Sequence, residues 1–180
     1  MSEIFLLERI ETPTGPMLVA TDEAGLLRAV EWYDKEDRFQ RLLARRYGKG
    51  AISLRETKEA SAATRALHAY FAGDLGAVDA IETKTTGTAF QRNVWAALRR
   101  IPAGTTMSYG ALAKALDCPN AVRAVGLANG ANPIPVVVPC HRVIGANGAL
   151  TGFGGGIERK HWLLTHEGFL KSSPPDLFGE

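Results

Sequence analysis

Cysteine and histidine are scarce in this sequence of 180 residues. Its two cysteines, Cys118 and Cys140, cannot build the disulfide framework of a small secreted protein, and they lack the C-x-x-C spacing of a structural zinc site. Its four histidines are scattered along the chain: His68, His141, His161 and His166. The sequence therefore predicts a protein with reduced thiols that binds no metal and needs no cofactor.

Long apolar runs are also missing. No run reaches the roughly 18 residues that a helix needs to span a bilayer. The N-terminal stretch M-S-E-I-F-L-L-E-R is too short and too acidic for a signal peptide. Because 46% of the residues are hydrophobic and 22% are charged, the composition is that of an ordinary globular protein. We therefore expect a cytoplasmic protein that has no membrane partner.

Acidic residues are few in the second half of the chain. Residues 88–171 hold 9 Lys and Arg against 3 Asp and Glu, whereas residues 1–87 hold 12 against 14. A basic domain suits a polyanion such as nucleic acid. A chance excess of solvated basic side chains explains the same counts equally well at this point.

The first half of the sequence predicts strands followed by helices. Apolar runs separated by the turn signals P-T-G-P and D-E-A-G predict strands over residues 4–33. The stretches 34–47 and 57–73 carry apolar residues at helical spacing. The polar stretch T-K-T-T-G-T at 83–88 is the expected linker to the second half.

The second half predicts mainly helices. Apolar residues at helical spacing predict a helix over 89–101, which Pro102 stops. Ser108 can cap a short helix over 109–116, and another helix is expected over 120–130. Two short helices joined by a tight turn form a helix-turn-helix, although many helical proteins contain such a pair by chance.

The helix expected over 120–130 is built largely of small residues. Gly126 costs about 1 kcal/mol relative to alanine in an exposed helix interior, so its use suggests that something approaches closely. Arg123 lies on the other side of the helix from the apolar arc and could enter a nucleic-acid groove. A plain surface arginine on a poorly packed helix is equally compatible with this pattern.

Cys140 stands directly beside His141 in the stretch P-V-V-V-P-C-H-R-V-I. Adjacent side chains of an extended segment point to opposite faces, so the pair requires either a turn of the chain or a water between sulfur and imidazole. The prolines of this stretch favour a strand edge or a pocket lip. A histidine oriented by a carboxylate raises the reactive thiolate fraction, and Glu167 is the most interesting carboxylate in this half. An inert buried cysteine is the alternative.

The second half contains five stretches that are specific when taken together: F-Q-R-N-V-W, I-P-A-G-T-T-M-S-Y-G-A-L-A, R-A-V-G-L-A-N-G-A-N-P, P-C-H-R-V-I-G and G-F-G-G-G-I-E-R-K-H-W-L-L-T-H-E-G. In order and spacing they resemble the 6-O-alkylguanine-DNA alkyltransferases, the methylated-DNA–protein-cysteine methyltransferases, in their free-standing bacterial type. The resemblance implies an α/β (α+β) fold. Residues 1–86 would form a ribonuclease-H-like α/β domain with a small antiparallel sheet. Residues 87–171 would form a mainly helical, winged helix-turn-helix-like domain that carries the active site, and 172–180 a flexible tail.

The resemblance also implies an activity. Cys140 would attack the alkyl carbon of 6-O-alkylguanine in DNA, and of 4-O-methylthymine, and would keep the alkyl group as a thioether. The transfer is irreversible, so one protein would repair one lesion. The implied partner is double-stranded DNA that contains an alkylated base, bound by a monomer without a cofactor or metal.

The resemblance implies roles for five further residues of this chain. His141 would take the thiol proton through a water, and Glu167 would orient His141. Asn132 would link the recognition helix to the active-site strand. Tyr109 would crowd the phosphate beside the lesion and place its hydroxyl near the base. Arg123 would fill the gap that the flipped base leaves, with the recognition helix in the minor groove.

Two positions depart from the pattern of some members of the family. Phe153 stands where some have tyrosine, and Gly154 stands where some have serine. Both changes predict a roomier pocket that tolerates bulkier alkyl groups. The complete set expected to contact DNA or the base is Tyr109, Ala121, Arg123, Ala124, Gly126, Leu127, Pro135, Val143, Phe153 and Gly154.

Three other classes of protein were weighed against the alkyltransferase. A non-enzymatic lesion-binding relative replaces the reactive cysteine, and the presence of Cys140 argues against it. A thiol hydrolase needs an oxyanion hole, for which the sequence offers no separate sign. A plain helix-turn-helix regulator has no need of a Cys-His pair. The alkyltransferase is therefore the interpretation that accounts for both the helices and the thiol.

Overall fold

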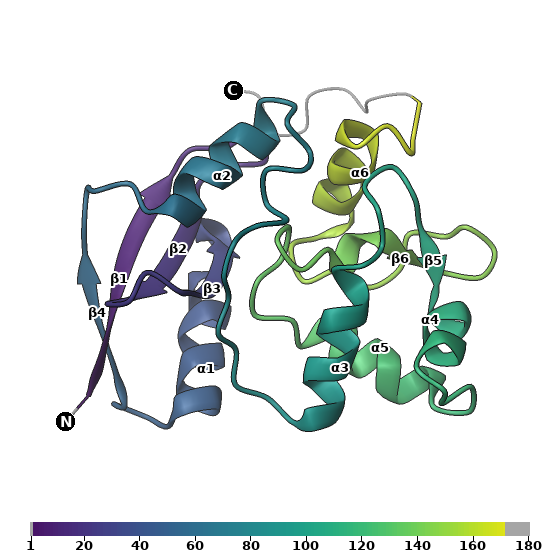
Figure 1. The fold of residues 1–180 in the computed structure, drawn as a ribbon, viewed down its shortest axis with the longest axis horizontal. Helices are drawn as coiled ribbons and strands as arrows, with labels where there is room; N and C mark the ends of the chain where they lie inside the picture. The colour runs from purple at the N-terminus through teal and green to yellow at the C-terminus, as the bar shows by residue number, and fades with distance from the viewer. Residues whose placement is uncertain (1, 172–180) are drawn as a thin grey trace. The chain divides into compact units, whose positions relative to one another are not determined.

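The computed structural model describes residues 2–171, so the tail expected at 172–180 lies outside the described residues. The chain divides into two compact units, Met1–Thr86 and Gly87–Glu180, each of which is described by itself (Figure 1). Within residues 2–171, the helices are all too short or too polar to cross a bilayer.

The first unit is built on a four-stranded sheet in the order β3-β2-β1-β4. Its strands are β1 (Glu3–Ile10), β2 (Met17–Asp22), β3 (Leu27–Trp32) and β4 (Ile52–Glu56). The pairs β1–β2 and β2–β3 are antiparallel, whereas β4 pairs parallel with β1. The sheet is therefore mixed, and the expectation of an antiparallel sheet is wrong. The reason is the crossover through a helix between β3 and β4, which brings the chain back in the direction of β1.

Helix α1 (Glu36–Tyr47) makes this crossover, after a short 3-10 turn η1 (Tyr33–Lys35). Its buried residues Phe39 and Leu43 pack against apolar side chains of the sheet: Phe5, Leu7, Leu18, Ala20 and Ala29. The helix predicted over 34–47 is thus confirmed, and its apolar face is the one that covers the sheet.

Helix α2 (Ala62–Phe71) follows β4 and begins later than the predicted start at residue 57. Ser61 caps it, because the Ser61 hydroxyl accepts a hydrogen bond from the Thr64 amide at 3.1 Å. The Ser61 amide and hydroxyl also donate to the buried carboxylate of Glu8 in β1, at 2.9 and 2.6 Å. These bonds fix the start of α2 at the end of β1.

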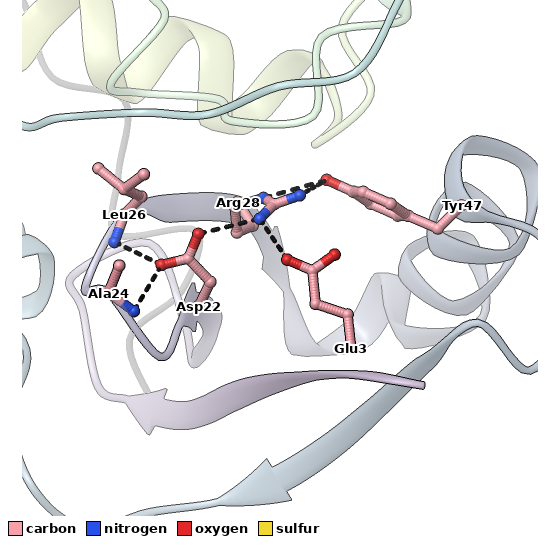
Figure 2. Close-up of polar contacts among 6 residues, drawn as sticks. All are labelled: Glu3, Asp22, Ala24, Leu26, Arg28 and Tyr47. Carbon is pink, nitrogen blue, oxygen red and sulfur yellow. Dashed lines mark hydrogen bonds and ion pairs between the residues drawn. The ribbon is translucent and has the colours of Figure 1, made fainter. Parts of the chain in front are cut away.

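A buried cation, Arg28 of β3, ties this unit together (Figure 2). Its guanidinium donates to Asp22 Oδ2 at 2.9 Å, to Glu3 Oε1 at 2.8 Å and to the Tyr47 hydroxyl at 3.1 Å. The other oxygen of Asp22 accepts from two backbone amides of the turn between β2 and β3. One side chain thereby connects β1, the β2–β3 turn and the end of α1.

The second unit is mainly helical. It contains α3 (Ala89–Leu98), β5 (Met107–Ser108), α4 (Tyr109–Ala115), α5 (Val122–Gly130), the 3-10 turn η2 (Cys140–Arg142), β6 (Val143–Ile144) and α6 (Ile157–His166). Strands β5 and β6 pair in parallel as a two-stranded sheet. The expected mixed α/β architecture, with a mainly helical second half, is confirmed.

Helices α4 and α5 form the predicted helix-turn-helix. The Ser108 hydroxyl accepts a hydrogen bond from the Ala111 amide at 3.0 Å, so Ser108 caps α4 as predicted. Helix α3 packs against α5, and the Trp95 indole donates to the Ala128 carbonyl at 2.9 Å. Val125 and Ala128 are buried on this side of α5, which leaves its other face on the surface.

Candidate active site

The segment that leads to Cys140 is a series of turns. Residues 133–138 form bends and turns, so the expected active-site strand is wrong. The Asn132 side chain explains the geometry: its amide donates to the Val138 carbonyl at 2.7 Å, and its oxygen accepts from the Ile134 amide at 2.9 Å. Val136 has φ +74°, which is rare for a β-branched residue. Asn132 thus ties the end of α5 to the approach to the thiol.

Cys140 is the first residue of η2 and only 6% exposed. Its amide donates to the Val138 carbonyl at 2.8 Å, and the Arg142 amide donates to the Pro139 carbonyl at 3.0 Å. The chain therefore turns at the Cys-His pair, which is one of the two arrangements that the sequence allowed. The turn directs consecutive side chains to different partners.

His141 is fully buried and lies against Glu167, the residue that follows α6. The Nε2 atom of His141 is 2.8 Å from Glu167 Oε1. Arg142 completes the cluster, with Nε 2.9 Å from Glu167 Oε2 and Nη2 2.8 Å from Oε1. Arg142 Nη1 also donates to the Ile101 carbonyl at 2.6 Å. We call His141, Arg142 and Glu167 the His-Arg-Glu cluster.

Charge within the His-Arg-Glu cluster is set by its contacts. Burial alone would raise the pKa of Glu167, but the hydrogen bonds and charges of His141 and Arg142 lower it far below its ordinary value. Burial lowers the pKa of His141, the contact with Glu167 opposes this, and the charges of Arg142 and Lys160 lower it further. Near neutral pH the cluster therefore holds a carboxylate, a guanidinium and a neutral imidazole.

The neutral imidazole has a defined tautomer. An ionised carboxylate only accepts hydrogen bonds, so the proton of His141 is on Nε2, where it faces Glu167. The lone pair is then on Nδ1, which is buried and has no hydrogen-bond partner within residues 2–171. A free basic nitrogen is thus present on the residue next to the thiol, which suits it to accept the thiol proton.

Tyr109 opens α4 and is half-buried. Its hydroxyl donates to the Thr151 carbonyl at 3.2 Å. Burial raises the pKa of Tyr109, the hydrogen bond to Thr151 lowers it, and the charge of Cys140 raises it. The phenol therefore stays protonated near neutral pH. A Cβ built on Gly126 would lie 3.8 Å from the Tyr109 ring, an ordinary contact, so the ring does not require glycine there.

The outer face of α5 carries exposed residues of the expected DNA-contact set. Arg123 and Ala124 are exposed, and Leu127 is 72% exposed, which is unusual for a leucine. Ala121, at the N-cap, and Gly126 are partly buried. The helix therefore presents an arginine and an apolar side chain among small residues.

The remaining residues that were expected to contact DNA or the base differ in their burial. Pro135 and Val143 are buried, whereas Phe153 is partly buried and Gly154 is exposed. Phe153 and Gly154 belong to the loop between β6 and α6, which also carries Thr151. A base therefore cannot reach Pro135 or Val143 in this structure.

Sequence reasoning missed two residues of the site, Arg142 and Lys160. Lys160 is fully buried on α6, and its position was detectable, since Leu163, Leu164 and Glu167 follow at spacings of three, four and seven. A lysine on the core face of a helix is rare unless it has partners. Arg142 had no comparable signal, because its partners lie 25 and 41 residues away along the chain.

Metal ligands do not gather at this site. Within residues 2–171, no group of three or more His, Cys, Asp or Glu side chains could hold a metal ion. Cys118 is partly buried and lies in the turn between α4 and α5, apart from the His-Arg-Glu cluster in the chain and in its hydrogen bonds.

Known proteins are similar to this chain over the half that contains the site, and in part over nearly its whole length. The family described as 6-O-methylguanine DNA methyltransferase, DNA binding domain, matches residues 89–169. A methylated-DNA–protein-cysteine methyltransferase of Salmonella typhimurium is 53% identical over 165 residues, which cover 92% of this chain and 96% of that protein. The chain belongs to the methylated-DNA–protein-cysteine methyltransferases.

A second relative and a solved structure are also similar to this chain. The methylated-DNA–protein-cysteine methyltransferase of Methanosarcina acetivorans is 45% identical over 170 residues, covering 88% of this chain and 95% of that one. Among solved structures, Mycobacterium tuberculosis OGT in complex with DNA superimposes with a TM-score of 0.72 at 37% identity, covering 96% of this chain and 97% of that chain. The fold and the family assignment therefore agree.

Proposed function

We propose that this chain repairs alkylated DNA by moving the alkyl group of 6-O-alkylguanine to the sulfur of Cys140. One observation carries the proposal: the buried contact of 2.8 Å between His141 and Glu167, with His141 directly beside Cys140, in a member of the methylated-DNA–protein-cysteine methyltransferases. Relatives at 45% to 53% identity bear that name, and the solved relative at 37% identity binds DNA.

The chemistry follows from the protonation states of the cluster. The thiol proton of Cys140 passes through a water to Nδ1 of His141, and Glu167 stabilises the imidazolium that forms. The thiolate forms a bond to the alkyl carbon as the bond from that carbon to O6 breaks. The electron pair of the broken bond moves onto the guanine, which takes up a proton. Cys140 is left as a thioether, so each molecule acts once.

Recognition of the lesion is assigned to α5 and its surroundings. The exposed face of α5 enters the minor groove, where Ala124 and Gly126 allow close approach. Arg123 replaces the flipped base in the stack, and Tyr109 crowds the neighbouring phosphate. Binding of duplex DNA by a monomer, and repair of 4-O-methylthymine in addition to guanine lesions, belong to the same proposal.

The test is stoichiometric labelling with a defined lesion. The protein is incubated with a duplex oligonucleotide that contains 6-O-methylguanine, and the mass gain is mapped by peptide. We expect one methyl group on the peptide that contains Cys140, and none in Cys140→Ser. Labelling of Cys118, repeated turnover, or binding without transfer would overturn the proposal, and the last outcome would indicate a lesion-binding or regulatory protein.

A further inference from the structure

The first unit contains a cavity of about 550 Å³. Its walls are the second half of β1, the segment that follows β4, and α2. All of its lining residues belong to the first unit, whereas the residues assigned to alkyl transfer belong to the second. Cavities of this size accept small molecules, and the proposed transfer makes no use of this one.

Glu8 is the buried acid of the cavity, with only 4% of its surface exposed. Its Oε1 accepts a hydrogen bond from the Ser61 amide at 2.9 Å, and its Oε2 accepts one from the Ser61 hydroxyl at 2.6 Å. Both donors are neutral. Within residues 2–171, Glu8 forms no ion pair with a lysine, arginine or histidine. Buried carboxylates are normally paired, so Glu8 lacks a cation.

The Glu8 carboxylate keeps room for further donors. Its two oxygens offer about four lone-pair directions in total, and Ser61 occupies one direction on each oxygen. Each oxygen therefore has one direction left. A cation that carries several N–H groups can donate to both oxygens and supplies the positive charge at the same time.

Thr64 provides a second unsatisfied polar group in the same cavity. The residue lines the cavity and is 3% exposed. Its hydroxyl oxygen is buried and has no hydrogen-bond partner within residues 2–171. Leaving a buried hydroxyl unpaired is unfavourable, and an N–H donor bound in the cavity would remove this cost.

The basic residues of the cavity do not replace the missing cation. The Arg9 guanidinium lies 3.7 Å from Glu56 and 4.6 Å from the centre of the Tyr33 ring, so it is engaged at the surface. Lys58 is exposed, and its charge is screened by water and salt. A metal ion does not fit either, because within residues 2–171 no three His, Cys, Asp or Glu side chains gather to bind one.

We propose that this cavity binds a small organic cation, an ammonium or guanidinium group on a short aliphatic chain, through the Glu8 carboxylate and the Thr64 hydroxyl. The apolar residues Leu7, Ile10 and Ala60 are also among the lining residues, which suits an aliphatic chain. The ligand site is independent of the proposed transfer to Cys140.

The inference is tested by NMR titration of the whole, nitrogen-15-labelled protein. The probes are butylammonium chloride and butylguanidinium chloride, with sodium chloride at equal ionic strength and neutral 1-butanol as controls. We expect the backbone amide signals of Ser61 and Thr64 to shift in a saturable way with at least one cation. The tighter of the two cations identifies the head group. Shifts that sodium chloride or 1-butanol reproduces would overturn the inference.

Two substitutions locate the bound cation. Glu8→Gln should raise the Kd of the tighter probe roughly tenfold or more, because the charge-assisted hydrogen bonds are lost. Glu11→Gln is the matched control, since it removes an exposed carboxylate just beyond β1 and should leave the Kd unchanged. An unchanged Kd in a folded Glu8→Gln protein would show that the cation binds elsewhere.

Thr64→Val decides the matter if Glu8→Gln does not fold. Valine keeps the shape of threonine, and the lost hydroxyl has no partner within residues 2–171, so the fold should remain stable. We expect the Kd of the tighter probe to rise several-fold, because the cation loses one acceptor. The same Kd as in the unsubstituted protein would overturn the inference.

Discussion

Nε2 of His141 lies 2.8 Å from Oε1 of Glu167, and both side chains are buried. The two residues are 26 positions apart in the sequence, so only the folded second unit brings them together. Arg142 binds the same carboxylate through two nitrogens. The imidazole is thereby held in one orientation and one tautomer, with Nδ1 available as a base.

Replacing Glu167 by glutamine should strongly slow alkyl transfer. The amide does not stabilise an imidazolium, and it leaves the buried Arg142 without its anionic partner. We expect the second-order rate constant with the lesion oligonucleotide to fall roughly a hundredfold to ten-thousandfold. Glu158→Gln, an exposed position on α6, is the matched control and should keep the rate of the unsubstituted protein. A rate for Glu167→Gln within a factor of about two of that protein contradicts the assigned role.

The His-Arg-Glu cluster should make the free energy of unfolding decrease as the pH falls. The pKa of Glu167 is lowered on folding, so its contribution is present above the ordinary value of 4.5 and is lost as the pH falls further. His141, whose pKa is lowered from 6.5, takes up a proton more readily when unfolded, and this opposes folding below that pH. Urea unfolding should therefore show decreasing stability from neutral to acidic pH, and a smaller decrease in Glu167→Gln.

Lys160 gives a separate prediction at alkaline pH. Its pKa is lowered from 10.5 to about 8, so between these values the unfolded chain binds more protons than the folded one. The contribution of Lys160 to the free energy of unfolding should rise across this window. The difference in unfolding free energy between the unsubstituted protein and Lys160→Met isolates this contribution, since other groups titrate in both. A difference that stays constant across the window would show that Lys160 is not perturbed.

Arg123→Ala should weaken repair of duplex DNA more than reaction with the free base 6-O-benzylguanine. The free base needs no flipping, so it tests the chemistry of Cys140 alone. Arg100→Ala is the matched control, because it removes another exposed arginine of the same unit and reports the loss of general electrostatic attraction. Equal losses with both substrates would mean that Arg123 does not act in flipping.

Phe153 and Gly154 should make the pocket tolerant of large alkyl groups. We expect the ratio of the inactivation rates with benzyl- and ethyl-guanine to fall in the double variant Phe153→Tyr, Gly154→Ser. The added hydroxyls occupy space in the loop between β6 and α6. The same benzyl-to-ethyl ratio in the unsubstituted protein and the double variant would contradict the prediction of a tolerant pocket. The inactivation rate with the methyl lesion serves as the internal reference.

Arg28→Met should destabilise the first unit. The substitution leaves the carboxylates of Asp22 and Glu3 without their buried cation, and breaking a buried ion pair costs about 3–5 kcal/mol. The comparison is Arg55→Met, since Arg55 pairs with Glu23 at 3.9 Å on the surface and should contribute less than about 1 kcal/mol. Urea unfolding measures both, and equal effects would contradict the role given to Arg28.

Local patterns in the sequence predicted several elements correctly. The apolar face of α1, the cap at Ser108 and the helix-turn-helix are determined by neighbours within one or two helical turns. Strand β4 was missed because its sequence, I-S-L-R-E, has only two apolar residues, and because its parallel pairing with β1 depends on residues about 49 positions away. Its type could not be decided without the tertiary arrangement.

The candidate site likewise combines features that are visible in the sequence with features that depend on the tertiary fold. The adjacency of Cys140 and His141 is visible in the sequence, and Glu167 was chosen from three carboxylates. The turns before Cys140 depend on two side-chain hydrogen bonds of Asn132, and the burial of Lys160 depends on two distant carbonyls. These tertiary hydrogen bonds override the local conformational preferences of the chain. They therefore could not be predicted from the sequence alone.

The burial of Cys140 has a consequence for the protein after repair. An alkyl group added to a side chain that is 6% exposed enlarges a packed interior, and overpacking typically costs about 1–3 kcal/mol. We therefore expect the alkylated protein to melt at a lower temperature than the fresh one. The lesion would be converted from a chemical defect in DNA into a folding defect in a protein, which cellular proteolysis can recognise and remove.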